Sequence, residues 1–158
     1  MNALSVKNLA KAYKNGVQAL KGSDLDVEEG DFSGSTNEGI MSRRVSNVHA
    51  QYSKFHGCGQ AMIASRGFIN AVNPDIQNTT SAVKSAVVAE QGGICIISQG
   101  AEEGYANNTA QLLNLAGDGL RAYSGGVISA TGIMIDNVGR DGIICGNAGK
   151  VAFSSSTL

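Results

Sequence analysis

Hydrophobic and polar residues alternate in short runs along most of the chain. Four of these runs share one pattern, in which a glycine precedes two hydrophobic residues separated by a single position. Alternation with a period of two places successive side chains on opposite faces of a β-strand. We therefore predict strands at Gly67–Ala71, Gly93–Ile97, Gly126–Ala130 and Gly149–Phe153, with a fainter copy at Arg44–Val48.

Two further sets of alternating residues recur in the same order between these glycines. One set is Ala61/Ile63, Val87/Ala89, Leu120/Ala122 and Ile143/Cys145, and the other is Ala50/Tyr52/Phe55, Ala110/Leu112/Leu115 and Ile133/Ile135/Val138. An antiparallel sandwich is the alternative all-β fold, but its strands recur about every 8–12 residues without grouping in threes. Three strands per repeat favour an all-β, right-handed parallel β-helix (a β-solenoid) of about four to five rungs, with a short N-terminal β segment.

The clearest repeat begins at Asn114 and returns 23 positions later at Asn137. In a β-helix these two residues occupy the same position of successive rungs, where we expect their amides to form a ladder. Asp118 and Asp141 have the same spacing, and each precedes a glycine. Asp-Gly is typical of turns, so we interpret both aspartates first as turn residues.

Composition excludes several classes of partner. Charged residues make up 16% of the chain and the formal net charge is −1. This gives no basic footprint for nucleic acid or for an anionic membrane surface. The hydrophobic runs are far shorter than a membrane span, and the first residues lack the pattern of a signal peptide. We expect neither a nucleic-acid partner nor a membrane partner.

The cysteines and histidines do not indicate a metal site. Cys58, Cys95 and Cys145 include no CxxC pair and no zinc-ligand spacing. Cys95 and Cys145 occupy hydrophobic strand positions, where cysteine packs as a small apolar side chain. We predict free, buried thiols. His49 and His56 have no carboxylate or cysteine at ligand spacing, so we expect them to serve in packing or at the surface.

The N-terminal segment has a different character from the repeats. It contains Tyr13 and three alternating runs: Leu4–Leu9, Val17–Leu20 and Leu25–Val27. Together these residues resemble the opening strands of an ABC-transporter ATP-binding subunit. The resemblance implies that Tyr13 is the remnant of an adenine-stacking position. It ends at Phe32, and the phosphate-loop pattern GxxxxGK[ST] occurs nowhere in the chain. We therefore expect no ATP binding and no cofactor.

These differences predict three parts in the chain. Residues 1–32 form the truncated ABC-ATPase-like segment, and residues 33–43 begin with the small polar side chains of a linker or junction. Residues 44–158 form the β-helix repeat domain. We interpret the whole as a chimera of two unrelated parts.

A second resemblance is carried by Gly117–Gly132 and Val138–Val151. These stretches resemble the repeats of phage tailspike and tail-fibre β-helices. The resemblance implies a homotrimer that binds, and often cleaves, bacterial surface polysaccharide. It also implies a protein made in the bacterial cytoplasm and carried in the virion tail.

The longest interval between repeats is the predicted binding region. Residues 98–109 add about ten residues to the shortest rung, and long excursions from a solenoid often form its binding face. Glu102 and Glu103 are a candidate carboxylate pair for catalysis on a sugar, and Asp118 with Asp141 is another. Candidate ligand-binding residues are Tyr105, Asn107 and Asn108.

The sequence thus predicts a structural and binding module that recognises bacterial polysaccharide. Two alternatives remain open. One is a polysaccharide lyase or hydrolase that uses one of the two carboxylate pairs. The other is a chimeric scaffold without an evolved function.

Overall fold

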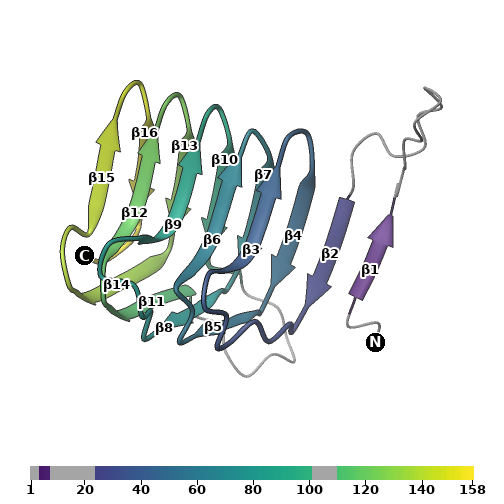
Figure 1. The fold of residues 1–158 in the computed structure, drawn as a ribbon, viewed down its shortest axis with the longest axis horizontal. Coiled ribbons are helices and arrows are strands. Elements are labelled where there is room, and N and C mark those ends of the chain that lie inside the picture. The colour runs from purple at the N-terminus through teal and green to yellow at the C-terminus, as the bar shows by residue number, and fades with distance from the viewer. Residues whose placement is uncertain (1–3, 8–23, 101–109) are drawn as a thin grey trace.

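A computed structural model describes residues 4–7, 24–100 and 110–158 of the chain. These residues form strands and connecting segments with no helix, and they wind into a right-handed parallel β-helix of about five turns. Figure 1 shows the strands side by side along the stack, with the two ends of the chain at opposite ends. The predicted fold is confirmed.

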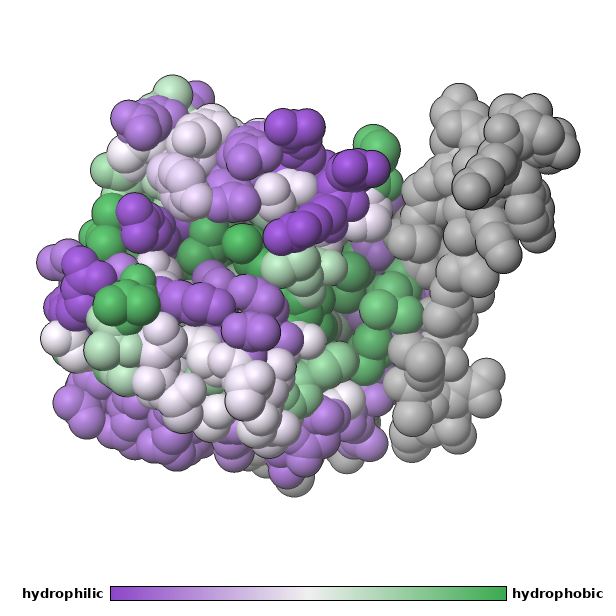
Figure 2. All heavy atoms as spheres, viewed as in Figure 1, coloured by the Kyte–Doolittle hydropathy of each residue, from purple (hydrophilic) through white to green (hydrophobic). Residues whose placement is uncertain are grey.

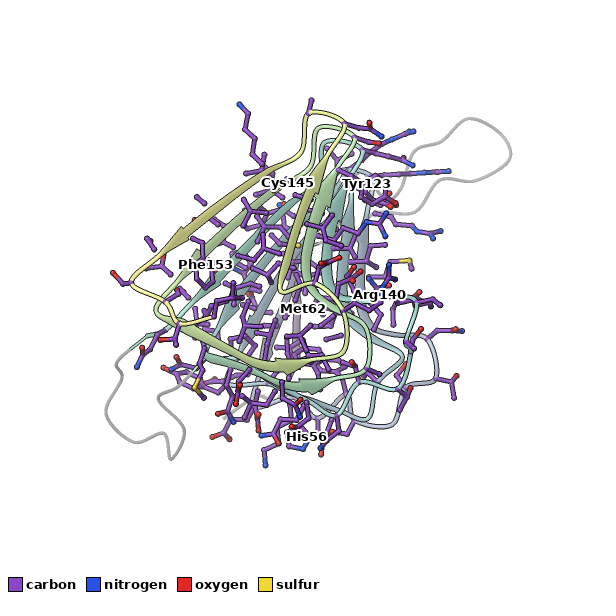
Figure 3. All side chains as sticks on the ribbon, turned by 90° about the vertical axis from the view of Figure 1, so that its left-hand side faces the viewer. His56, Met62, Tyr123, Arg140, Cys145 and Phe153 are labelled. Carbon is purple, nitrogen blue, oxygen red and sulfur yellow. The ribbon has the colours of Figure 1, made fainter. Side chains whose placement is uncertain are left out.

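Three sheets form the sides of the stack, and the cross-section is triangular (Figure 3). The seven-stranded sheet contains β1 (Leu4–Lys7), β2 (Asp24–Glu28), β4 (Asn47–Gln51), β7 (Phe68–Val72), β10 (Ile94–Ser98), β13 (Val127–Thr131) and β16 (Lys150–Ser154). The five-stranded sheet contains β3 (Glu38–Arg43), β6 (Gln60–Ser65), β9 (Ser85–Glu90), β12 (Asp118–Tyr123) and β15 (Ile143–Gly146). The four-stranded sheet contains β5 (Lys54–His56), β8 (Asp75–Gln77), β11 (Ala110–Leu115) and β14 (Ile133–Val138).

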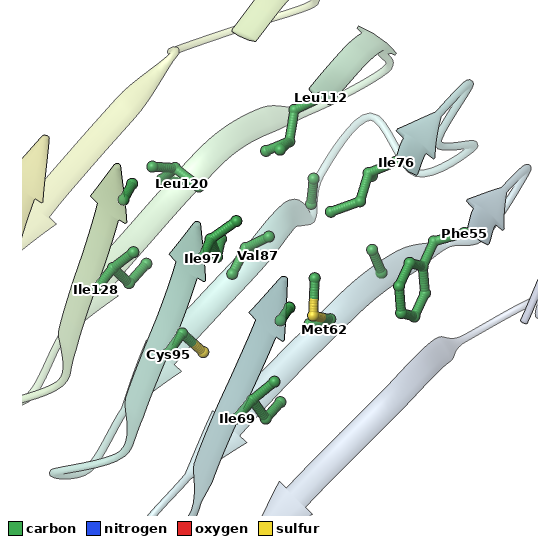
Figure 4. Close-up of a cluster of buried hydrophobic side chains, with 14 of the residues drawn as sticks. Phe55, Met62, Ile69, Ile76, Val87, Cys95, Ile97, Leu112, Leu120 and Ile128 are labelled. Carbon is green, nitrogen blue, oxygen red and sulfur yellow. The ribbon is translucent and has the colours of Figure 1, made fainter. Parts of the chain in front are cut away.

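The core consists of columns of inward side chains, one column residue from each rung. Phe55, Ile76, Leu112 and Ile135 form such a column in the four-stranded sheet, and each is at most 2% exposed. Figure 4 shows similar columns from all three sheets meeting in the centre. Because each rung pairs in register with the next, like side chains stack on like and exclude water.

Two of the predicted sets of inward residues are partly wrong: one is shifted by one position along its strand, and the other includes residues from a different sheet. In β6 the column that continues to Val87 contains Met62, whereas Ile63 pairs with Val88 on the other face. Ala61–Ala64 is a continuous apolar run, so its period of two fits either phase. Ala50 pairs with Ala71 in the seven-stranded sheet, and only Phe55 of its predicted set lies in the four-stranded sheet.

The recurring glycine of the repeat has a steric cause. At Gly93, Gly126 and Gly149, an added Cβ would lie 2.1 Å from the carbonyl oxygen of Ala64, Ala89 or Ala122, respectively. At Gly67 it would lie 2.2 Å from Ser42 Oγ. The starts of β7, β10, β13 and β16 therefore approach another rung at a distance that only glycine permits.

The corners between sheets are held by residues in the left-handed conformation. Asn78 follows β8, and Asn114 and Asn137 are the next-to-last residues of β11 and β14, with φ of 53°, 53° and 52°. Asparagine tolerates this conformation better than most residues do. Asn137 Nδ2 donates a hydrogen bond to Asn114 Oδ1 at 2.7 Å, which confirms the predicted amide ladder for this pair.

The stack begins before residue 44. β2 pairs in parallel with β4, and β3 pairs in parallel with β6, so both continue sheets of the β-helix. The second half of the predicted linker, Glu38–Arg43, is therefore a strand. The first rung also includes Phe32, whose ring stacks on Phe55 with centroids 5.2 Å apart. β1 covers the edge of β2 by antiparallel pairing.

At the other end of the stack, β15 and β16 are the edge strands of their sheets, whereas β14 is also paired with Thr157 on its outer side. Cys145 pairs with Ala122 and occupies the same column, yet Cys145 is exposed and Ala122 is fully buried. The prediction of a buried thiol is wrong for Cys145, because β15 is an edge strand and no further strand of the described residues covers this position. It is confirmed for Cys58 and Cys95, whose thiols are buried and free.

Candidate functional site

The predicted binding residues of the long interval, and Tyr13, lie outside the described residues. They remain predictions: Glu102, Glu103, Tyr105, Asn107 and Asn108. Gly100, the last described residue before this segment, is held by Asn73. Asn73 is 1% exposed, and its side chain accepts a hydrogen bond from Gly100 N at 2.9 Å and donates one to Gly100 O at 2.8 Å.

The second predicted carboxylate pair is separated by burial. Asp118 is 0% exposed and begins β12. Its Oδ2 accepts a hydrogen bond from Ser85 Oγ at 2.9 Å, and its Oδ1 lies 3.5 Å from Arg140 Nε and 3.4 Å from Asp141 N. Asp141, in contrast, is exposed. A carboxylate that is enclosed and occupied in this way connects rungs and is unsuited to proton transfer with a sugar.

A cluster of polar side chains lies on the outer surface of the four-stranded sheet, which we call the polar face. It consists of Lys54, His56, Asp75, Gln77 and Gln111. Between them along the strands, Phe55, Ile76 and Leu112 point into the core. Figure 3 shows His56 pointing away from the stack on this side. The alternation of the three strands therefore produces one apolar and one polar surface.

Asp75 is the centre of the polar face. Its Oδ2 lies 2.7 Å from His56 Nε2, and its Oδ1 accepts hydrogen bonds from Gln77 Nε2 at 2.8 Å and Gln111 Nε2 at 2.9 Å. Burial opposes ionisation of Asp75, but the hydrogen bonds from Gln111, Gln77 and His56 outweigh it and lower the pKa of the carboxyl group. Asp75 therefore orients three side chains from three rungs.

This arrangement presents hydrogen-bonding groups toward solvent. The side-chain nitrogens of Gln77 and Gln111 donate to Asp75. Their Oε1 atoms have no hydrogen-bond partner among the residues the structure describes. Lys54 adds a charged donor on the neighbouring strand, and the His56 side chain is 37% exposed. Fixed amides and charged groups spaced about 4.8 Å apart on successive strands suit a ligand with many hydroxyl groups.

Sequence reasoning missed the polar face. The prediction for His56 was a role in packing or at the surface, and Asp75, Gln77 and Gln111 were not among the candidate residues. The usable signal was the repeat itself, because Lys54 pairs with Asp75 and His56 pairs with Gln77, each 21 positions further along. Aligning the outward positions of successive rungs, as well as the inward ones, would have brought these residues together.

Comparisons with known proteins do not assign this chain to a family. No protein-family model matches the chain, and no solved structure is significantly similar to it. Within the described ranges, no group of three or more histidine, cysteine, aspartate or glutamate side chains is placed to hold a metal ion. The same residues contain no helix that could cross a membrane. The class that the fold defines is that of the β-solenoids.

Proposed function

We propose that this chain is a binding module that recognises bacterial surface polysaccharide through the polar face of its β-helix. The observation that supports the proposal is the group of side chains around Asp75, which is fixed by hydrogen bonds and presents Gln77 and Gln111 to solvent. A polysaccharide is itself a repeating chain of hydroxyl groups, and parallel strands supply binding groups at a regular spacing. The likeness of the repeats to phage tailspikes supports the same ligand class.

The burial and hydrogen bonding of Asp118 and Asp75 favour binding over catalysis. Asp118 is enclosed, and Asp75 is occupied by three donors. General acid–base work on a glycosidic bond needs a pair of carboxyl groups that reach the substrate. Of the two carboxylate pairs predicted for a lyase or hydrolase, Glu102 and Glu103 are therefore the pair that remains.

The test is glycan binding by matched amide variants. A glycan array identifies a ligand, and a titration followed by NMR then measures the Kd. We expect Gln77→Ala combined with Gln111→Ala to weaken binding at least tenfold. Gln51→Ala, which truncates an amide on the seven-stranded sheet, should leave the Kd within twofold. Absence of binding to every glycan, or equal Kd values for all three proteins, would refute the proposal.

The proposal includes a homotrimer, the assembly that the tailspike resemblance implies. Light scattering coupled to size-exclusion chromatography measures the mass in solution. Three copies of the 16.2-kDa chain are expected. A monomer would remove the trimer from the proposal while leaving the glycan test unaffected.

A further inference from the structure

Three arginines gather in a hollow where the five-stranded sheet meets the seven-stranded sheet, which we call the arginine hollow. Its volume is about 310 Å³, and its lining residues are Arg43, Arg44, Ser65, Arg66, Glu90 and Gln91. Figure 2 views the five-stranded sheet from outside and shows hydrophilic side chains along this upper edge of the molecule. The hollow is remote in the fold from the polar face, which belongs to the third sheet.

Successive rungs build the hollow as two short columns. Arg43, Ser65 and Glu90 pair with one another at the ends of β3, β6 and β9. Arg44, Arg66 and Gln91 each follow one of these residues at the corner. Arg44 N donates to Ser65 O at 3.0 Å, and Arg66 N donates to Glu90 O at 3.3 Å. The backbone therefore fixes where all three arginine side chains begin.

Two of the three arginines lie at left-handed corners of the backbone. Arg44 and Arg66 have φ of 56° and 57°, in the left-handed region. The equivalent corners of the later rungs have the same conformation at Gln91, Ser124 and Asn147, with φ of 54°, 49° and 48°, so the left-handed corner belongs to the fold as a whole.

The positive charge of the hollow is not balanced by ion pairs within the described part of the chain. None of the three guanidinium groups makes a salt bridge there. Glu90 is the acidic residue of the lining, and its Oε2 accepts a hydrogen bond from the hydroxyl group of Tyr123 in the next rung. That hydrogen bond raises the pKa of Tyr123 and so keeps the phenol protonated as a donor.

We infer that the arginine hollow binds oxyanion groups: carboxylate, sulfate or phosphate. Guanidinium groups match the planar geometry of such groups and donate two hydrogen bonds to each. Three like charges on adjacent rungs also repel one another, and a bound anion removes that repulsion. Resting on the proposed function, the inference specifies its ligand as an acidic polysaccharide whose charged groups enter the hollow.

The test uses two kinds of probe and a matched pair of charge variants. Inorganic sulfate probes the hollow alone, and trigalacturonate, with neutral maltotriose beside it, probes the acidic glycan. Amide NMR shifts of Arg44 and Arg66 report binding at the site. Arg66→Gln removes one charge from the hollow, and Lys150→Gln removes one charge from β16 as the control. Urea unfolding checks that both variants are folded.

We expect sulfate and trigalacturonate to shift the amides of the hollow, with maltotriose causing no shift there. Arg66→Gln should weaken both anions at least fivefold, Lys150→Gln less than twofold, and Arg66→Lys should recover part of the loss. No shift with sulfate, or equal Kd values in Arg66→Gln and Lys150→Gln, would overturn the inference. Sulfate binding that depends on Arg66, together with no glycan binding anywhere, would uphold the anion site and refute the proposed function alone.

Discussion

The middle rungs and the last rung contain the same pattern but differ in what covers it. Ile128, with strands β10 and β16 on either side, is 0% exposed. Ile143, on the last rung, pairs with Leu120 and with no second strand among the described residues, and it is half-buried. The two isoleucines point inward in equivalent ways. Their difference shows that burial in a solenoid depends on the number of neighbouring rungs, whereas the direction of a side chain depends on its own strand.

The largest expected effect comes from truncating the covered isoleucine. Ile128→Ala should lower the free energy of unfolding by about 3–4 kcal/mol, since it leaves a cavity that two rungs enclose. Ile143→Ala should cost about 1 kcal/mol, because water already reaches that side chain. Urea unfolding measures both. Equal losses would contradict the dependence on neighbouring rungs.

A smaller effect is expected where the last rung is attached to the one before it. Asp118→Ala removes the carboxylate that contacts Ser85, Arg140 and the backbone of Asp141, and should cost about 2–3 kcal/mol. Asp141→Ala, at an exposed position, should change stability by less than about 0.5 kcal/mol. Hydrogen exchange gives a second measurement, in which Asp118→Ala should speed exchange in β15 more than in β9. Uniform acceleration would contradict attachment through Asp118.

The contribution of Asp75, on an inner rung, to the pH dependence of the unfolding free energy should be smaller still. The folded pKa of Asp75 lies below the ordinary value of 3.8, so its ionised form stabilises the folded state above that pH. This contribution should disappear as the pH falls from 3.8 through the folded pKa. Asp75→Asn should abolish that step in a plot of unfolding free energy against pH, while Asp136→Asn, at an exposed position, should retain it. A step that persists in Asp75→Asn would assign it to another group.

The smallest effect on stability is expected at the thiol of the last rung. Cys145→Ser should change the free energy of unfolding by less than about 0.5 kcal/mol. In the native protein, iodoacetamide should modify Cys145 and spare Cys95, because burial raises the pKa of the Cys95 thiol to about 12. Mass spectrometry of the peptides identifies the modified residue. Modification of Cys95 at the same rate would show that the inner rungs open as readily as the end.

The sequence was sufficient for the fold because the inward positions repeat. Alternation at Gly126–Ala130 and at Leu120/Ala122 gave both the strands and their parallel stacking. It was insufficient at Ala61–Ala64, where four consecutive apolar residues fit either phase and only pairing with β9 decides. It was also insufficient at Cys145, whose burial depends on a neighbour that periodicity does not reveal.

The candidate sites were harder to predict than the fold because they join outward residues from different rungs. Asp75 and Gln111 are 36 positions apart, and they meet through strand pairing. Arg43 and Arg66 are neighbours only because β3 and β6 pair with an offset of 22 residues, which places Arg66 one position beyond the partner of Arg43. No local sequence motif indicates that either pair of residues is in contact. An alignment of complete rungs, outward positions included, would bring both pairs together.

The connection between β10 and β11 has a consequence for how such a chain can vary. β10 pairs in register with β7 and β13, and β11 pairs in register with β8 and β14, although the segment between them lengthens this rung to 33 residues. The Asn73 side chain fixes the point of departure at Gly100. Sequence can therefore be gained or exchanged at this corner without shifting any strand, so the scaffold can remain constant while the inserted segment diversifies.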